Sequence, residues 1–221
     1  KHRATHVGIA WDVKREETVR RKKYDFYKAT RSELPEPLIQ QFETLKIVLD
    51  RIGVRQIEQA PFEADDLIGT LSTKWSEEAK GNCFIYSNDK DLLQLLNENT
   101  SQIISQKREE VIYTIDKFRD EYGIDSKQWI DVKALLGDTS DNIPGCPGVG
   151  EKSALPLIQQ YHSVEKLYEQ IEELDNKFNR YKRKLINGKE FAFMSKELAT
   201  IICDISHLDA LDLDDFKLGF E

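Results

Sequence analysis

The stretch GDTSDNIPGCPGVGEKSA occupies residues 137–154 and joins two carboxylates, Asp138 and Asp141, to a loop rich in glycine and proline. Three glycines precede a predicted helix there, and Lys152 lies at its start. Glycine lets a backbone approach a ligand closely, and the free amides at a helix start can bind a phosphate. Carboxylates beside such a loop would repel a phosphate unless divalent cations lay between them. The stretch therefore predicts further metal ligands elsewhere in the chain.

Other acidic residues lie at the ends of apolar segments. Asp12 ends an apolar run at residues 5–12, and Asp89 and Asp91 follow a second run. In open α/β sheets, ligands bind at the carboxyl ends of the strands. A helix predicted over residues 60–80 adds three more acids near its start: Glu63, Asp65 and Asp66. Oxygen ligands favour Mg²⁺ or Mn²⁺ over zinc, and clustered carboxylates of this kind predict two-metal phosphoryl transfer.

Each acidic group also has an ordinary structural explanation, and the sequence alone leaves these open. Acids in a first helical turn complement the helix dipole, typically by about 0.3–1 kcal/mol. The stretch NDKD is typical of a turn with a helix cap at Asp91, and GDTSDN has the composition of a turn. The combination of four acidic sites at element ends favours metal binding, because such a cluster is costly without cations.

The order of the predicted elements indicates the fold class. In the first half of the chain, predicted strands and amphipathic helices alternate, at residues 5–12, 37–52, 54–59, 60–80 and from 83 onward, with a further helix beginning at DLLQLL, residues 91–96. This alternation predicts an α/β fold with a mostly parallel sheet. Beyond residue 125 the pattern is helical, over 126–136 and 151–170, and Pro156 should kink or restart the second of these helices. We expect two domains, residues 1–125 and 126–221.

Composition and charge narrow the class of protein. The 221 residues are 39% hydrophobic and 33% charged, and no apolar run is long enough to cross a membrane. Three scattered cysteines and the absence of a secretory signal pattern predict a reducing, cytoplasmic location. The net charge of −8 argues against a nucleic-acid partner, but residues 14–31 carry eight basic and three acidic side chains. A locally basic segment of this kind can bind phosphates.

Within that segment, aromatic and basic side chains alternate. Aromatic rings can stack on unpaired bases while cations hold phosphates, although Tyr24 and Phe26 are better explained as core residues. Lys28 and Arg31 are three residues apart, so both could face the carboxylates and stabilise a scissile phosphate from the side opposite the metals. The glycine-rich hairpin would hold the nucleic-acid backbone irrespective of base sequence.

Five motifs, in order, resemble those of the bacterial 5′ nuclease family: YKATR, EADDLIGTL, SNDKDLLQL, LLGDTSDNIPGCPGVGEKSA and KELATI. That family includes the 5′-3′ exonuclease domain of DNA polymerase I and stand-alone flap endonucleases. The resemblance implies a PIN-like α/β core, a helical arch formed here by about residues 14–36, and a helix-three-turn-helix (helix-hairpin-helix) lobe that grips duplex DNA. It also implies Mg²⁺-dependent cleavage at 5′ flaps, nicks and 5′ ends.

The resemblance assigns roles to residues of this chain. The metal ligands it implies are Asp12, Glu63, Asp65, Asp66, Asp89, Asp91, Asp138 and Asp141. The catalytic residues are Lys28, Arg31, Asp65 and Asp89. The DNA contacts are Tyr27, Lys28, Arg31, Lys133, Gly148, Gly150, Lys152 and Ser153. A K⁺ ion in the hairpin would be held by backbone carbonyls, for which we expect those of Cys146 and Val149.

One departure from the family concerns the start of the chain. The family opens with a strand whose Asp-Gly pair binds metal, and nothing in this sequence matches it. Because the sole methionine is Met194, Lys1 is not a translation start, and we expect the native first strand to be missing from this numbering.

The hypothesis favoured by the sequence is a monomeric, structure-specific 5′ nuclease with two Mg²⁺ or Mn²⁺ ions. The alternative is a module of the same fold that binds branched DNA without cutting it. A ribonuclease on a related core is a weaker third hypothesis, since the hairpin favours duplex DNA. The sequence does not decide the balance between exonuclease and flap-endonuclease action.

Overall fold

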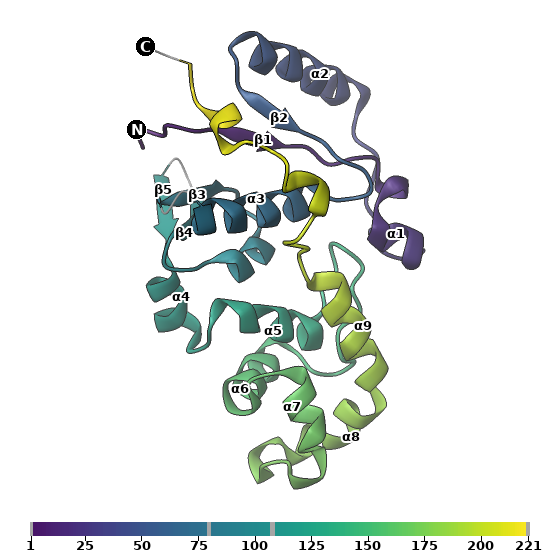
Figure 1. The fold of residues 1–221 in the computed structure, drawn as a ribbon. Coiled ribbons are helices and arrows are strands. Elements are labelled where there is room, and N and C mark those ends of the chain that lie inside the picture. The colour runs from purple at the N-terminus through teal and green to yellow at the C-terminus, as the bar shows by residue number, and fades with distance from the viewer. Residues whose placement is uncertain (1, 79–80, 107–108, 220–221) are drawn as a thin grey trace.

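The computed structural model describes residues 2–78, 81–106 and 109–219. Its strands lie in the upper half of Figure 1, which we call the sheet half (residues 2–113), and helices α4 to α9 lie below in the helical half (residues 115–199). The chain then returns upward and pairs with its own beginning. The Val7 amide donates to the Phe216 carbonyl at 2.8 Å, and the Leu218 amide donates to the Thr5 carbonyl at 2.9 Å.

The strands form two small sheets. β1 (Gly8–Ala10) pairs in parallel with β2 (Arg55–Ile57). β3 (Cys83–Tyr86) pairs in parallel with β4 (Thr100–Gln106), which pairs antiparallel with β5 (Glu109–Tyr113). The expected α/β class and the predominance of parallel pairing are confirmed. β4 and β5 were not predicted, because their polar residues mask the alternation that identifies a strand.

Three helices belong to the sheet half. α1 (Val19–Lys23) is short, α2 (Glu36–Arg51) matches the helix predicted over 37–52, and α3 (Ala64–Glu78) lies within the predicted range 60–80, of which residues 79–80 are outside the described residues. Within residues 14–36, expected to form an arch, the helical structure is a 3₁₀ turn at Arg15–Glu17 and α1. None of the α2 residues is buried, so its apolar face is exposed despite its amphipathic sequence.

The helical half contains six α-helices in the described part of the chain: α4 (Ile115–Tyr122), α5 (Trp129–Leu136), α6 (Glu151–Tyr161), α7 (Val164–Glu169), α8 (Asn179–Asn187) and α9 (Lys189–Ala199). The expectation of one helical region over 151–170 was wrong in one respect. His162 has a positive φ of 69° and ends α6, and the Ser163 hydroxyl then accepts the Lys166 amide to begin α7. Pro156 does not restart a helix, since α6 continues through it.

The largest hydrophobic core joins the two halves. Leu93 and Tyr113 of the sheet half belong to the same buried cluster as Phe118, Leu135 and Leu157 of the helical half. A helix predicted from DLLQLL is a 3₁₀ helix, Lys90–Leu95, and contributes to this core. Among the described residues, no helix is long and apolar enough to cross a membrane. The shared core fixes how the acidic residues of the two halves face each other.

Candidate active site between the two halves

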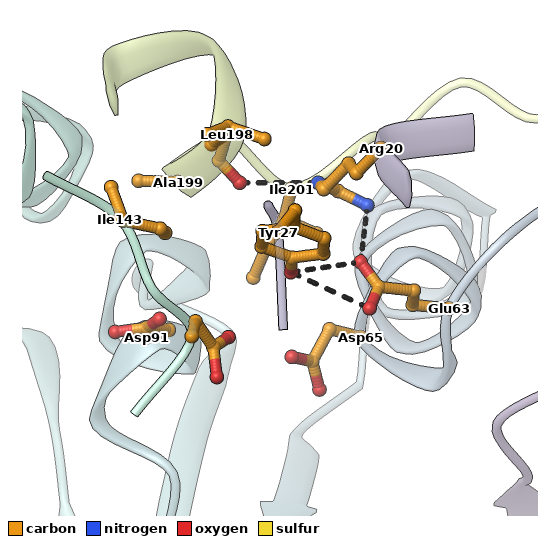
Figure 2. Close-up of a pocket in the computed structure, with 10 residues that line it drawn as sticks. Arg20, Tyr27, Glu63, Asp65, Asp91, Ile143, Leu198, Ala199 and Ile201 are labelled. Atoms are coloured by element: carbon orange, nitrogen blue, oxygen red, sulfur yellow. Dashed lines mark hydrogen bonds and ion pairs between the residues drawn. The ribbon is translucent and has the colours of Figure 1, made fainter. Parts of the chain in front are cut away.

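Acidic residues from both halves meet around one small cavity. Glu63, Asp65 and Asp91 of the sheet half line it together with Asp141 of the helical half, and its volume is ≈ 20 Å³. Figure 2 shows Glu63 and Asp65 near the start of α3 and Asp91 on the opposite side of the cavity. A cavity of this size holds a water molecule or an ion but no nucleotide. The structure thus brings these four acids of the two halves together around one cavity, and their role as metal ligands stays a prediction.

Glu63 lies directly before α3 and is buried among donors. Its carboxylate accepts from Arg20 at 2.8 Å, from the Tyr27 hydroxyl at 3.2 Å, and from Lys28. Figure 2 shows the first two of these contacts as dashed lines. Burial raises the pKa of Tyr27, as does the negative charge of Glu63, so the phenol remains a donor. The buried carboxylate is thus held by three groups instead of by water.

The turn that carries Lys28 and Arg31 is attached to the loop of the helical half. Lys28 has a left-handed backbone with φ of 53°, and its amide donates to the Asp141 carbonyl at 2.9 Å. Its ammonium contacts Glu63 and lies 3.8 Å from the Asp141 carboxylate, with which Arg31 forms an ion pair. Burial opposes the charge of Lys28, but the nearby Glu63 and Asp141 carboxylates outweigh it and raise its pKa. Both cations therefore face the carboxylates, as the spacing predicts.

Lys133 lies between two of the predicted metal ligands. Its ammonium is 2.8 Å from Asp91 and 2.6 Å from Asp138, so this predicted phosphate contact neutralises carboxylates in the structure. Burial acts to raise the pKa of Asp138, but hydrogen bonds from Lys133 and Ser140 hold it at about 2. Burial raises the pKa of Asp91 despite the same lysine. Asp138 also accepts the Ser140 amide at 2.8 Å, so the turn role considered for GDTSDN is real as well.

Three predicted ligands have no paired cation. Asp65 has no hydrogen-bond or ion-pair partner among the described residues, and Asp89 and Asp12 accept only backbone amides, Asp91 and Ala64. Asp89 caps the 3₁₀ helix, a role that the sequence had suggested for Asp91. Burial raises the pKa of Asp65 to about 7, and the negative charges of Asp89 and Asp12 contribute. Such mutual repulsion is what a bound cation would relieve.

These residues fit a hard divalent cation. Their donors are carboxylate oxygens, which suit Mg²⁺ and Mn²⁺. The mutual repulsion of Asp65, Asp89 and Asp12 would be relieved by positive charge between them. Within residues 2–78, 81–106 and 109–219, however, no group of three or more acidic, histidine or cysteine side chains is close enough to hold an ion as placed. Lys28 and Lys133 neutralise Glu63, Asp91 and Asp138, and these carboxylates are open to an ion only where the lysines release them.

The hairpin between α5 and α6 has the backbone that its glycines allow. Gly148 has φ of 81°, a conformation that side chains disfavour, and Gly150 precedes α6. Lys152 is exposed on the first turn of α6, where it can contact a phosphate. Ser153, predicted to contact DNA, is buried, and its hydroxyl donates to the Gly150 carbonyl at 2.9 Å. The Ser153 side chain therefore stabilises the hairpin by an internal hydrogen bond and does not face solvent.

The carbonyls predicted to hold K⁺ belong to Cys146 and Val149. The Cys146 carbonyl already accepts the Val149 amide at 3.0 Å. The K⁺ assignment remains a prediction, since nothing in the described residues tests it.

Sequence reasoning missed two basic features. Arg20 is buried and contacts the acidic motif of α3, which its position in a basic run gave no reason to expect. The second feature is α8 with its flanks, residues 176–189, which carry six basic side chains and no acid. Lys184 of α8 reaches the Gly148 carbonyl at 3.2 Å, so this basic surface adjoins the hairpin. A local charge count over the second half of the chain would have found it.

Comparison with known proteins identifies relatives over nearly the whole chain. The family model of the 5′-3′ exonuclease N-terminal resolvase-like domain matches residues 1–123, and that of the 5′-3′ exonuclease C-terminal SAM fold matches residues 124–219. A protein of Halalkalibacterium halodurans named 5′-3′ exonuclease is 59% identical over 217 residues, which are 98% of this chain and 72% of that protein. DNA polymerase I of Bacillus subtilis is 42% identical over 202 residues, or 90% of this chain and 22% of the polymerase.

Solved structures agree with this assignment. The bacteriophage T5 5′-exonuclease, determined with bound divalent zinc ions, superposes with a TM-score of 0.69 at 25% identity, covering 95% of this chain and 79% of that one. The catalytic core of Rad2 in complex with a DNA substrate superposes with a TM-score of 0.62, covering 96% of this chain and 67% of that one. At 19% identity, the second likeness concerns the fold alone.

Proposed function

The chain belongs to the 5′-3′ exonuclease family, and from this premise we propose that it hydrolyses DNA phosphodiesters at 5′ flaps and 5′ ends with the help of two Mg²⁺ or Mn²⁺ ions. The observation that carries the proposal is the state of Asp65. This carboxylate lines the cavity, burial and the charges of Asp89 and Asp12 raise its pKa to about 7, and among the described residues it has no hydrogen-bonding partner. A carboxylate in these surroundings lowers the stability of the fold, and a protein that only binds DNA would gain nothing in return.

The unpaired acids are the proposed holders of the metal ions. Asp12, Asp65 and Asp89 carry the negative charge that remains without a cation, and Glu63, Asp91, Asp138 and Asp141 join them when Lys28, Arg31 and Lys133 move. Bound Mg²⁺ or Mn²⁺ supplies a water of lowered pKa and stabilises the charge that develops on the phosphate. The oxygen-only donor set supports these metals.

The basic residues are the proposed phosphate contacts. Lys28 and Arg31 lie on one turn at the edge of the cavity and pair with carboxylates in the protein alone. A DNA phosphate would replace those carboxylates as their partner, which frees Glu63 and Asp141 and places positive charge on the scissile group. The segment of about residues 14–36 would then arch over the unpaired end of the strand, with Tyr27 at its base.

Duplex DNA is proposed to lie on the helical half. The amides of the hairpin at Gly148 and Gly150, together with Lys152, would contact the backbone, and Lys184 and Arg183 of α8 extend the same basic surface. Contacts of this kind position the duplex and are indifferent to base sequence. The protein would then recognise a junction because the helical half holds the duplex while the sheet half holds the unpaired 5′ strand.

The test is cleavage of a 5′-flap duplex in Mg²⁺ by the protein and by its Asp89→Asn variant. Asp120→Asn is the matched control, because Asp120 is an exposed aspartate on α4 that does not line the cavity. We expect cutting near the junction, abolished in Asp89→Asn and unchanged in Asp120→Asn. Binding of the flap without cutting in Mg²⁺ and in Mn²⁺ would establish the binding module instead. Faster cleavage of a matched RNA hairpin would establish the ribonuclease.

A further inference from the structure

Every side-chain N–H group of Arg20 donates a hydrogen bond inside the protein. Its Nε donates to the Leu198 carbonyl at 3.1 Å. Its Nη1 donates to Glu63 at 2.8 Å and Asp66 at 2.7 Å, and its Nη2 donates to Asp66 at 2.8 Å and the Thr200 carbonyl at 2.6 Å. These are all five donors of a guanidinium, so Arg20 has none left for a substrate.

Asp66 is equally saturated. Oδ1 accepts from Arg20 and from the Ile202 amide at 2.9 Å, while Oδ2 accepts from Arg20 and from the Glu63 amide at 3.1 Å. A carboxylate offers about four acceptor sites, and Asp66 has four donors. Its exposed fraction is 0%. No oxygen of Asp66 is therefore open to the cavity that its neighbour Asp65 lines.

The backbone groups held by this pair belong to the return segment, which we define as residues 198–202, the last two residues of α9 and the three that follow. Gln94 binds the same segment from the other side: it accepts the Ile201 amide and donates to the Ala199 carbonyl, both at 3.0 Å. α3 approaches the segment so closely that a Cβ on Gly69 would lie 2.7 Å from the Ile201 side chain. The segment is thus fixed to the sheet half by hydrogen bonds and by packing.

We propose that Arg20 is a positioning residue that, with Asp66 as its counter-ion, orients Glu63 and holds the return segment of the helical half against α3. We call this set of hydrogen bonds between Arg20, Asp66 and the return segment the lock. This proposal rests on the proposed function, in which acids of both halves share the metals. Asp66 is accordingly a structural carboxylate and not a metal ligand, in contrast to the assignment that the family motif implies. The lock keeps Asp138 and Asp141 facing Asp65, because α9, which leads into the return segment, packs on α5, the helix that precedes the acidic loop.

Arginine is required here by geometry. A lysine has three donors on one atom and cannot span two carboxylates and two carbonyls in different directions. Burial acts to lower the pKa of Arg20, and the hydrogen bonds and charge of Asp66 more than offset it, so the guanidinium remains charged. Arg20→Lys therefore keeps the charge but loses the contacts.

The experiment compares the wild type with Asp66→Asn, Asp65→Asn, Arg20→Lys and Arg20→Met. Calorimetry with Mn²⁺ alone measures ion affinity, and amide hydrogen exchange measures protection at Ile202. We expect Asp66→Asn to lose no more Mn²⁺ affinity than Arg20→Lys, because both changes only release these contacts, whereas Asp65→Asn should lose at least about tenfold. Both Arg20 variants and Asp66→Asn should lose protection at Ile202, and Asp65→Asn should not.

Kinetics separates positioning from substrate contact. Both Arg20 variants should lower kcat for flap cleavage at least about tenfold with an unchanged KM, since Arg20 has no donor free for DNA. Arg20→Lys keeps the positive charge but not the directions of the five donors. If it does not retain kcat, the geometry of the hydrogen bonds is required in addition to the charge. If the single variants do not fold, the double variant Arg20→Met with Asp66→Leu removes both buried charges together and supports the same measurements.

Two results would overturn the inference. A loss of Mn²⁺ affinity in Asp66→Asn that equals that of Asp65→Asn and exceeds that of Arg20→Lys would make Asp66 a ligand. A raised KM with unchanged kcat in Arg20→Met would make Arg20 a substrate contact. If the wild type cuts no DNA, the proposed function fails, yet the Mn²⁺ and exchange measurements still decide whether the lock exists.

Discussion

Asp65 and Asp66 are neighbours on α3 and have opposite environments. Asp66 is fully buried and accepts four hydrogen bonds, two of them from Arg20. Asp65 is partly exposed to the cavity, and burial together with nearby Asp89 and Asp12 raises its pKa to about 7. Successive residues on a helix point about 100° apart, so one motif can place one acid inside the fold and the next in the site. A motif of clustered acids is therefore not one functional unit.

The contrast between paired and unpaired carboxylates also divides the other predicted metal ligands. Glu63, Asp91, Asp138 and Asp141 each have a lysine or arginine partner, whereas Asp12, Asp65 and Asp89 have none among the described residues. The cations neutralise the paired acids in the protein alone, whereas the charge of Asp65, with Asp89 and Asp12 nearby, is unfavourable until a cation binds. This division yields a set of predictions about stability without metal.

The largest effect is expected for Asp65→Asn. The pKa of about 7 lies above that of an unfolded aspartate, so the charged form is disfavoured in the fold by about 4 kcal/mol. Removing the charge should stabilise the metal-free protein by up to about that amount at pH 8 and lower Mg²⁺-dependent cleavage at least about a hundredfold. Urea unfolding in chelator at pH 8 measures the first effect, with Asp120→Asn as the control. Unchanged or reduced stability would break the distinction between paired and unpaired acids.

A somewhat smaller effect of opposite sign is expected for Lys133→Met. The variant keeps the length of the side chain but leaves Asp91 and Asp138 without their cation, which should destabilise the metal-free protein by about 3 kcal/mol at pH 8. The pKa of Asp138 should rise from about 2 toward its ordinary value. Adding Asp138→Asn to the variant should recover part of the loss. Chemical unfolding of the single and double variants measures both effects, and equal stability of Lys133→Met and wild type would contradict the pairing.

The sequence predicted where the acids would lie but not which of them would be paired. Asp12, Asp65 and Asp89 were placed at element ends by the strand and helix patterns, and those patterns hold in β1, α3 and β3. The partners could not be predicted, because Arg20 and Asp66 are 46 positions apart and Lys133 contacts Asp91 from another helix. Pairing depends on how the two halves pack, and periodicity within one element contains no information about that.

Two elements of the fold show the same limit of prediction from sequence. The amphipathic pattern of α2 predicted a helix correctly, yet it did not reveal that no residue of α2 would be buried. The break between α6 and α7 depends on His162 and the cap at Ser163, which are local signals weaker than the apolar pattern around them. Ser163 followed by Glu165 and Lys166 lacks the glutamate or glutamine three residues on that would complete a capping box.

The pH dependence offers a smaller effect. Asp138 has a pKa of about 2 in the fold, below that of an unfolded aspartate. Its contribution to stability is therefore present above about pH 4 and lost as the pH falls toward 2, and it amounts to about 1 kcal/mol once solvent screening is allowed for. Asp65 acts in the opposite sense, since its destabilisation is present above pH 7 and relieved as the pH falls toward 4. Metal-free stability should thus be greater at pH 5 than at pH 8, as measured by thermal unfolding in chelator. In Asp65→Asn that gain should vanish while the acid loss below pH 4 remains.

The smallest effect is expected for Asp12→Asn. Asparagine keeps an oxygen that can accept the Ala64 amide, which Asp12 accepts at 2.9 Å, so the start of α3 should not change. The charge of Asp12 is one cause of the raised pKa of Asp65, after burial and Asp89, and its removal should lower that pKa. Carboxyl NMR titration of metal-free protein measures the change directly, and Mn²⁺ calorimetry should show a loss of only a few-fold. An unaltered Asp65 titration would place Asp12 outside the site, whereas a lowered pKa with weaker Mn²⁺ binding would show that β1 and α3 contribute charge to the same ion.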